Sequence, residues 1–231
     1  MTVKVTAEKV YRRKIIMKAL MIIIAIMLLF SSAVYGVLYV VNKTGNFTIS
    51  LDPNLKTAYR IAMSPREDFK QTVILLQAKA LPYMDNITES WLPDDIDNVD
   101  GEHSGANYIA YTFYIQNQGT EPIDYMSAIT VQAVIKGVDE AVRVAVYHNG
   151  VKTTYAKKQK DKDTPEPNTT PFISNVRVME QVVKDFSPNE KDKFTVVIWL
   201  EGNDPQCVDD ILGGELKLLM VVRKFDEVPQ E

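Results

Sequence analysis

An uninterrupted apolar segment near the N-terminus is the strongest constraint on what this chain can fold into. From Ala19 to Val41 the sequence has 23 residues without a charged side chain. At about 1.5 Å per residue such a helix is roughly 34 Å long, which exceeds the bilayer's hydrocarbon thickness of about 30 Å. We therefore predict a transmembrane helix over residues 19–41 that contacts the lipid bilayer.

Positive charges flank this segment unevenly and predict its orientation. Only Lys43 follows it closely, whereas six cationic residues precede it: Lys4, Lys9, Arg12, Arg13, Lys14 and Lys18. Because cationic flanks stay on the cytoplasmic side of a membrane, residues 1–18 are predicted to form a cytoplasmic tail. We expect a single-pass protein of the cytoplasmic membrane with residues 42–231 outside.

The same N-terminal pattern also fits a secretory signal peptide. Ser31 and Ala33 would occupy the −3 and −1 positions of a cut after Ala33. However, eight further uncharged residues, from Val34 to Val41, continue the apolar run past that position. We favour a retained anchor, and cleavage stays open as the alternative.

Residues 42–231 carry the short alternating apolar and polar runs that are typical of strands. Clear runs occupy 47–51, 106–119, 123–137, 141–157, 192–202 and 214–225. Asn149-Gly150, between two alternating runs, predicts a tight hairpin. Residues 54–93 and 176–186 fit either strands or short helices. The spacing of the runs predicts a mainly β protein, an antiparallel β-sandwich.

The segment 157–171 is polar, charged and proline-bearing, with almost nothing to bury. This composition is typical of a mobile exposed loop. We interpret it as a solubilising excursion from the sandwich.

Few residues are suited to catalysis. The chain has two histidines, His103 and His148, and one cysteine, Cys207, and it lacks the spaced motifs of zinc peptidases, serine hydrolases and phosphate-binding loops. We predict that the protein is not an enzyme and needs no cofactor. A single cysteine also precludes an internal disulfide, which in an exported domain favours a bacterial envelope.

The best candidate metal site is the acidic stretch DDIDNVDGEH. Its carboxylates are those that calcium would require: Asp94, Asp95, Asp97, Asp100 and Glu102. The glycine does not fall where a twelve-residue calcium loop needs it, so we favour a solvated acidic loop over a metal site. A second acidic turn, with Glu201, Asp204, Asp209 and Asp210, is interpreted in the same way.

The order of these features resembles the TasA and camelysin group of bacterial envelope proteins. An apolar export segment precedes NFTISLD, and WLPDDID precedes a strand that ends in Asn117, Gly119 and Thr120. The resemblance covers about residues 25–135. It implies a jelly-roll-like sandwich exported across the cytoplasmic membrane, and, for some members, extracellular fibres. The apolar segment of this chain continues past the expected cut site and so departs from that pattern. Camelysins are sometimes called metallopeptidases, but this sequence has no pattern of zinc ligands.

Three functions follow, in order of preference. The first is a membrane-anchored extracytoplasmic sandwich that acts as a structural or interaction module at a bacterial surface, through a protein partner or self-association at sheet edges. The second is a secreted biofilm-matrix or fibre subunit released by signal peptidase. The third is an envelope metalloprotease. A net charge of -4 disfavours nucleic-acid binding.

Overall fold

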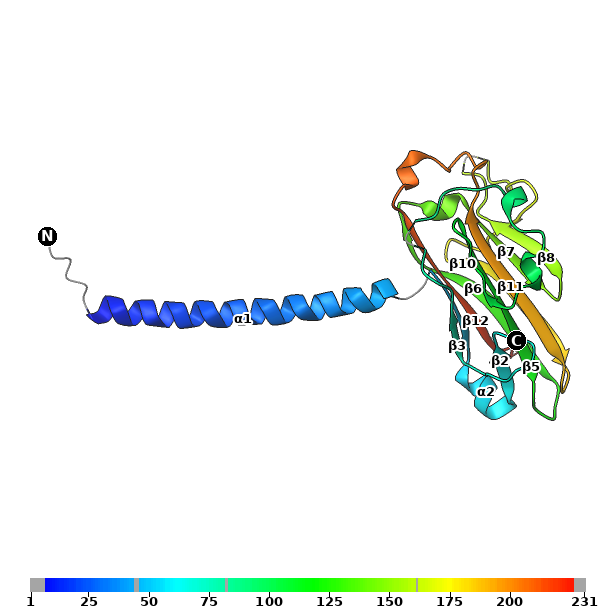
Figure 1. Ribbon diagram of the computed structural model, residues 1–231, viewed down its shortest axis with the longest axis horizontal. Coiled ribbons are helices and arrows are strands. Elements are labelled where there is room, and N and C mark those ends of the chain that lie inside the picture. Colours follow the sequence, from blue (N-terminus) through cyan, green and yellow to red (C-terminus); the bar gives the residue numbers. More distant parts are fainter. Residues whose placement is uncertain (1–6, 44–45, 82, 161, 227–231) are drawn as a thin grey trace, which may run out of the picture. The chain divides into compact units, whose positions relative to one another are not determined.

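The computed structural model describes residues 7–43, 46–81, 83–160 and 162–226. The chain divides into two compact units, residues 1–44 and 45–231. The first contains one long helix, α1 (Ala7–Lys43), and the second is built mainly of strands (Figure 1). The predicted mainly β fold behind one N-terminal apolar helix is therefore confirmed.

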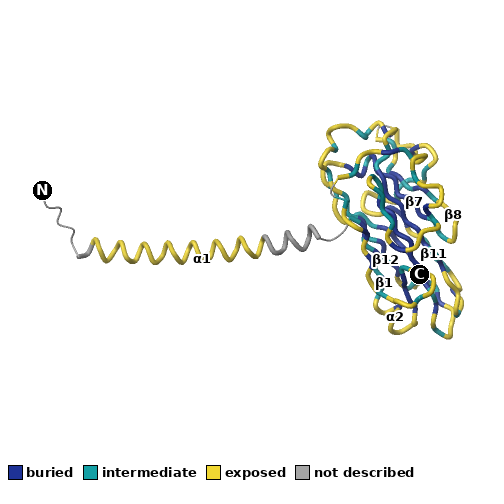
Figure 2. Tube along the Cα trace, viewed as in Figure 1, coloured by how far each residue is buried: buried dark blue, intermediate teal, exposed yellow. Residues whose placement is uncertain are grey.

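Helix α1 begins twelve residues before the predicted segment because its basic N-terminal part is also helical. Within it, Lys9–Val34 is long and apolar enough to cross a membrane, by length and composition. Figure 2 shows that α1 is exposed from Lys9 to Val34. Of the predicted tail, residues 1–6 with Lys4 lie outside the described part.

The second unit contains two sheets. In the five-stranded sheet the order is β10 (Arg177–Phe186), β6 (Ile123–Ile135), β12 (Glu215–Lys224), β1 (Phe47–Leu51) and β3 (Leu75–Gln77). In the seven-stranded sheet it is β2 (Ile61–Ser64), β5 (Tyr108–Asn117), β11 (Lys191–Leu200), β7 (Val142–His148), β8 (Val151–Ala156) and β9 (Thr170–Pro171), with β4 (Gly101–Glu102) beside β5. The short helices are α2 (Pro53–Tyr59), η1 (Glu89–Trp91), η2 (Ile96–Asn98), η3 (Val138–Glu140) and η4 (Asp209–Ile211).

Both sheets are mixed, which refines the expected antiparallel arrangement. Strand β1 runs parallel to β12, with Phe47 opposite Leu218, and β9 runs parallel to β8. The other strand pairs are antiparallel, including the long β11–β5 and β12–β6 pairs. Alternation along a strand specifies which side chains face the core, but it carries no information about the direction of the neighbouring strand.

The main core lies between the two sheets. It combines Phe47 and Met220 of one sheet with Phe113 and Phe194 of the other. The rings of Phe113 and Phe194 stack with their centroids 5.4 Å apart. A smaller apolar cluster on the outer face of the seven-stranded sheet contains the buried Trp199. Strands β5, β11 and β7 are thus buried on both faces, which explains their nearly continuous apolar sequences.

The predicted Asn-Gly hairpin is confirmed. Strand β7 pairs antiparallel with β8, and the turn residues Asn149 and Gly150 both have positive φ angles, of 51° and 82°. Such a turn matches the twist of the flanking strands. The ambiguous segment 176–186 forms strand β10, whereas 54–93 is divided among α2, β2, β3 and η1.

The structure corrects the interpretation of segment 157–171 as a loop with almost nothing to bury. Lys157 pairs with Asp139 at 2.6 Å, Glu166 is buried, and Thr170 and Pro171 form β9. Residue 161 lies outside the described part. Polar side chains hold this segment to the domain, so hydropathy alone underestimated how much of it is buried.

Candidate functional site

The structure does not bring the carboxylates of the predicted acidic site together. Asp94 and Asp95 are exposed. Asp97 Oδ1 lies 3.3 Å from Lys193 Nζ, and Asp100 Oδ1 accepts a 2.6 Å hydrogen bond from the Tyr114 hydroxyl. Burial, followed by that hydrogen bond, raises the pKa of Tyr114. Asp97 and Asp100 both lie near Tyr114, but these four carboxylates do not converge on a shared ligand position.

The other members of the loop are also separately placed. Glu102 is exposed on β4, and its Oε1 lies 3.4 Å from the backbone nitrogen of Ser104. The two ring nitrogens of His103 contact the carbonyl oxygens of Gly101 and Ile96, at 2.8 and 2.9 Å. Within the described ranges, no three His, Cys, Asp or Glu side chains are placed to hold a metal ion.

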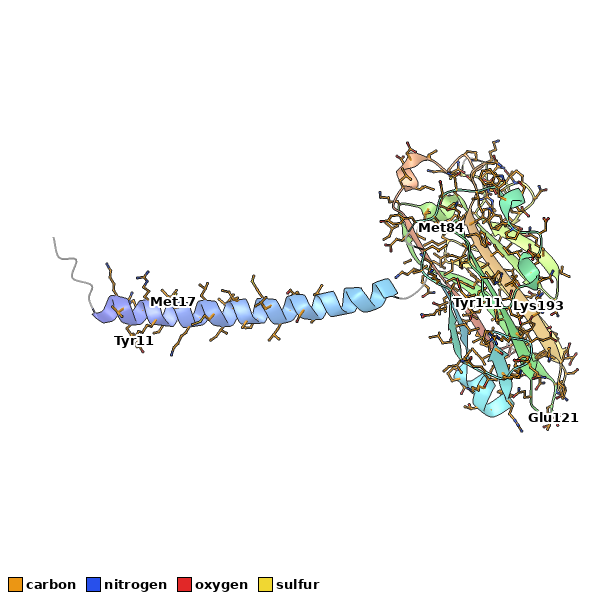
Figure 3. The ribbon with its side chains drawn as sticks, in the orientation of Figure 1. Tyr11, Met17, Met84, Tyr111, Glu121 and Lys193 are labelled. Atoms are coloured by element: carbon orange, nitrogen blue, oxygen red, sulfur yellow. The ribbon has the colours of Figure 1, made fainter. Side chains whose placement is uncertain are left out.

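A different site lies at one end of the sandwich, between the two sheets. We call this cavity of about 380 Å³ the end pocket. Its strand-borne walls are Ile109, Val142, Ile198, Leu200, Leu216 and Leu218. Residues of segments 83–86 and 207–215 complete the lining together with Asn46, Leu81 and Val138. Met84, at the pocket, lies toward the end of the domain opposite Glu121 (Figure 3).

The polar side chains at the end pocket include the amides of Asn46 and Asn86 and three carboxylates. Asp85, Asp209 and Glu215 line it, whereas none of the described lysines and arginines does. The thiol of Cys207 also lines it, and burial, followed by the negative charges of nearby carboxylates, raises the pKa of this thiol. The arrangement can accept an apolar ligand with a polar end.

Sequence analysis missed the end pocket because its lining comes from strand ends and loops that are far apart in the chain. The one local signal is the apolar content of the second acidic turn, where Val208, Ile211 and Leu212 interrupt the acidic residues. Val208 and Leu212 remain exposed in the folded domain.

A buried ion cluster lies beside a second, polar cavity of about 470 Å³. Arg143 Nη2 is 2.7 Å from Asp204 Oδ2 and 3.5 Å from Glu166 Oε2, and all three residues are buried. Burial, and then the charge of Asp204, raises the pKa of Glu166, although Arg143 opposes this change. The interpretation of Asp204 as part of a solvated acidic turn is therefore wrong.

Among the described strands, β10 offers the longest sheet edge. Its register shifts between Arg177 and Met179 and again between Val183 and Phe186, and Asp185 has a positive φ of 55°. Irregularity and exposed charge on an edge strand oppose the addition of a strand from another molecule. The remaining described edges are short: β3, β2, β9 and the first four residues of β8, which β9 does not cover.

Comparisons with known proteins identify no family. No family model and no curated protein matches the chain. Among solved structures, a β-glucosidase from Kluyveromyces marxianus in complex with glucose is 12% identical over 72% of this chain, at a TM-score of 0.25. This chain spans only 16% of that enzyme. The N-terminal domain of PorA is 11% identical over 72% of this chain and 97% of its own length, at a TM-score of 0.24.

Proposed function

We propose that this protein is a membrane-anchored extracytoplasmic β-sandwich that acts as an interaction module at a bacterial cell surface. The exposed apolar segment Lys9–Val34 carries the proposal. Exposure of that much apolar surface to water is unfavourable, whereas a bilayer would cover it. The helix would hold the domain at the membrane, where its loops and end pocket are available to partners.

Two serines inside the apolar segment are compatible with a bilayer. Ser31 Oγ donates to the carbonyl oxygen of Leu28 at 3.2 Å, and Ser32 Oγ donates to that of Leu29 at 2.9 Å. Within hydrocarbon each hydroxyl needs such a partner, because water is absent. Helix α1 also continues through Ala33 to Lys43, beyond the position of the alternative cut.

The secreted fibre subunit is the second candidate. It would need cleavage after Ala33 and strand addition between sheet edges. The irregular, charged edge of β10 argues against the second requirement. An envelope metalloprotease would require ligands that the described residues do not bring together.

The decisive experiment measures the intact mass and location of the native full chain. We expect an uncleaved chain in the membrane fraction after carbonate extraction. In spheroplasts, external proteinase K should degrade the domain and leave an N-terminal fragment. A soluble product that begins at Val34 would instead support the secreted subunit.

A matched pair of variants tests the anchor itself. Ile23→Asp with Ile26→Asp places two charges in the apolar segment, where each costs about 2.5–3.5 kcal/mol near a helix centre, so membrane association should fall. Ile173→Asp, at an exposed apolar residue of the domain, should leave it unchanged. Equal membrane retention of both variants would contradict anchoring by α1.

A further inference from the structure

The end pocket has the size and lining of a site for a small apolar ligand. Its volume of about 380 Å³ lies within the roughly 300–1,000 Å³ that such sites occupy. Leu81 and Met84 on one loop and Ile211 and Leu212 on another enclose space above the strand-borne walls. A chain of methylene groups placed there would leave water and contact apolar side chains.

Charge limits the chemistry of the ligand. Asp85, Asp209 and Glu215 line the end pocket, with no described lysine or arginine among its lining residues. At the mouth, however, Lys136 Nζ donates a 2.6 Å hydrogen bond to the carbonyl oxygen of Leu212, so one cation lies beside the lining carboxylates. A zwitterionic headgroup carries one charge of each sign and can face both the carboxylates and this ammonium, whereas a purely anionic headgroup would meet more negative than positive charge.

The mouth of the pocket carries apolar side chains that face solvent. Tyr83 is 90% exposed, Leu212 66% and Val208 50%, and all three belong to the lining. Neighbouring exposed apolar side chains of this kind mark contacts with a membrane or a protein.

The chain itself favours a membrane as the source of the ligand. Asn46 lines the end pocket, and α1 ends at Lys43. Three residues span at most about 10 Å in any arrangement of the two units. If α1 ends in a bilayer, hydrocarbon chains are the apolar molecules closest to Asn46 and the most concentrated.

We propose that the end pocket binds one hydrocarbon chain of a membrane lipid with a zwitterionic headgroup. This inference rests on the proposed membrane anchoring. The lipid would enter through the mouth formed by Tyr83, Val208 and Leu212, and its chain would lie between the ends of the two sheets. Lipid binding would hold this end of the domain at the membrane surface.

Photo-crosslinking of the full chain in phosphatidylcholine vesicles tests the proposal. The probe is a tracer phosphatidylcholine with a diazirine on its acyl chain, and labelled peptides are located by mass spectrometry. We expect labelling in α1 and, separately, in segments 81–86 and 207–216. Replacement of most of the phosphatidylcholine by anionic phosphatidylglycerol should lower the pocket labelling at least twofold.

Variants at the single cysteine separate pocket binding from surface adsorption. Cys207→Trp adds an indole to the pocket lining and should reduce labelling of 81–86 and 207–216 at least fivefold. Cys207→Ser keeps the volume open and should stay within twofold of the native chain. Labelling of α1 should be the same in all three proteins.

A second pair avoids dependence on a buried substitution. Leu212→Asp adds a negative charge at the mouth on an exposed side chain and should lower pocket labelling, whereas Leu75→Asp on β3 should not. Labelling of α1 without labelling of the pocket would overturn this inference and leave the anchor intact. Absence of labelling at both would overturn the anchor as well, and pocket labelling unaffected by Cys207→Trp and Leu212→Asp would show adsorption only.

Discussion

The hydroxyl of Tyr125 donates a hydrogen bond to Asp192 Oδ2, and this bond joins the two sheets through the interior of the sandwich. Tyr125 belongs to β6 and Asp192 to β11, and both are buried. Asn149 Nδ2 lies 2.6 Å from Asp192 Oδ1, and His148 Nε2 lies 3.3 Å from the same oxygen. One carboxylate thus connects the β7–β8 turn, β11 and the opposite sheet.

Removal of the Tyr125 hydroxyl should destabilise the domain without changing its shape. Tyr125→Phe leaves Asp192 without one of its donors, and an unsatisfied buried group costs about 1–3 kcal/mol. The free energy of unfolding can be followed in the full chain by denaturant titration with the fluorescence of the buried Trp199. Tyr83→Phe, at a phenol that is 90% exposed, is the control and should change stability by less than about 0.5 kcal/mol.

Acidification should weaken the domain partly through Asp192. Burial alone would raise the pKa of this carboxyl, but hydrogen bonds from His148, Tyr125 and Asn149 outweigh burial and hold the pKa below its ordinary value of 3.8. The folded state therefore favours the carboxylate, so its contribution is complete above the unfolded pKa and is lost as the pH falls through the folded pKa.

The native chain is accordingly expected to lose stability below about pH 4, and Asp192→Asn should remove part of this loss. Denaturation midpoints of both proteins between pH 7 and pH 2 provide the test. The variant should be less stable at pH 7, and the gap should narrow with acidification. A constant gap over the whole range would show that titration of Asp192 contributes nothing.

Local patterns in the sequence predicted the elements of the fold better than their contacts. A strand is predicted by the alternation of Val142, Val144 and Val146, and its turn by the Asn149-Gly150 pair. Both predictions rest on local backbone and side-chain preferences. The parallel pairing of β1 with β12 depends on residues about 170 positions apart, and alternation does not encode it. The fold class was therefore predictable, and the strand order was not.

Sites were harder to predict for the same reason. Arg143, Glu166 and Asp204 come from three segments that are far apart in the chain. In the sequence each of these charged residues looks like an ordinary solvent-exposed residue. Their burial follows only once the guanidinium and the carboxylates meet, because the pairing offsets the cost of desolvation. The acidic residues between 94 and 102 show the opposite case: they are neighbours in the sequence, but in the structure they contact different partners.

Calcium should have little effect on the domain. Asp94 and Asp95 are exposed, and Asp100 already accepts a hydrogen bond from Tyr114. Because a ligand stabilises a protein only in proportion to its binding to the folded state, millimolar calcium should shift the melting temperature of the full chain by less than about 1 °C. A saturable rise in melting temperature that Asp94→Asn with Asp95→Asn abolishes would revive the calcium site.

The two carboxylates beside Arg143 should respond oppositely to neutralisation. Asp204 is the closer partner, at 2.7 Å, and Asp204→Asn leaves a buried guanidinium whose remaining carboxylate lies 3.5 Å away, so we expect a loss of about 3–5 kcal/mol. For Glu166 the raised pKa means that folding disfavours its charged form, and this cost to stability appears as the pH rises through the carboxyl range. Glu166→Gln removes the excess negative charge while Asp204 still pairs with Arg143, so at pH 7 stability should be unchanged or higher.

Urea titrations of both variants at pH 7 and pH 4 measure this difference in the free energy of unfolding. Equal destabilisation by the two variants at pH 7 would mean that both carboxylates are needed as anions to hold Arg143 in the interior.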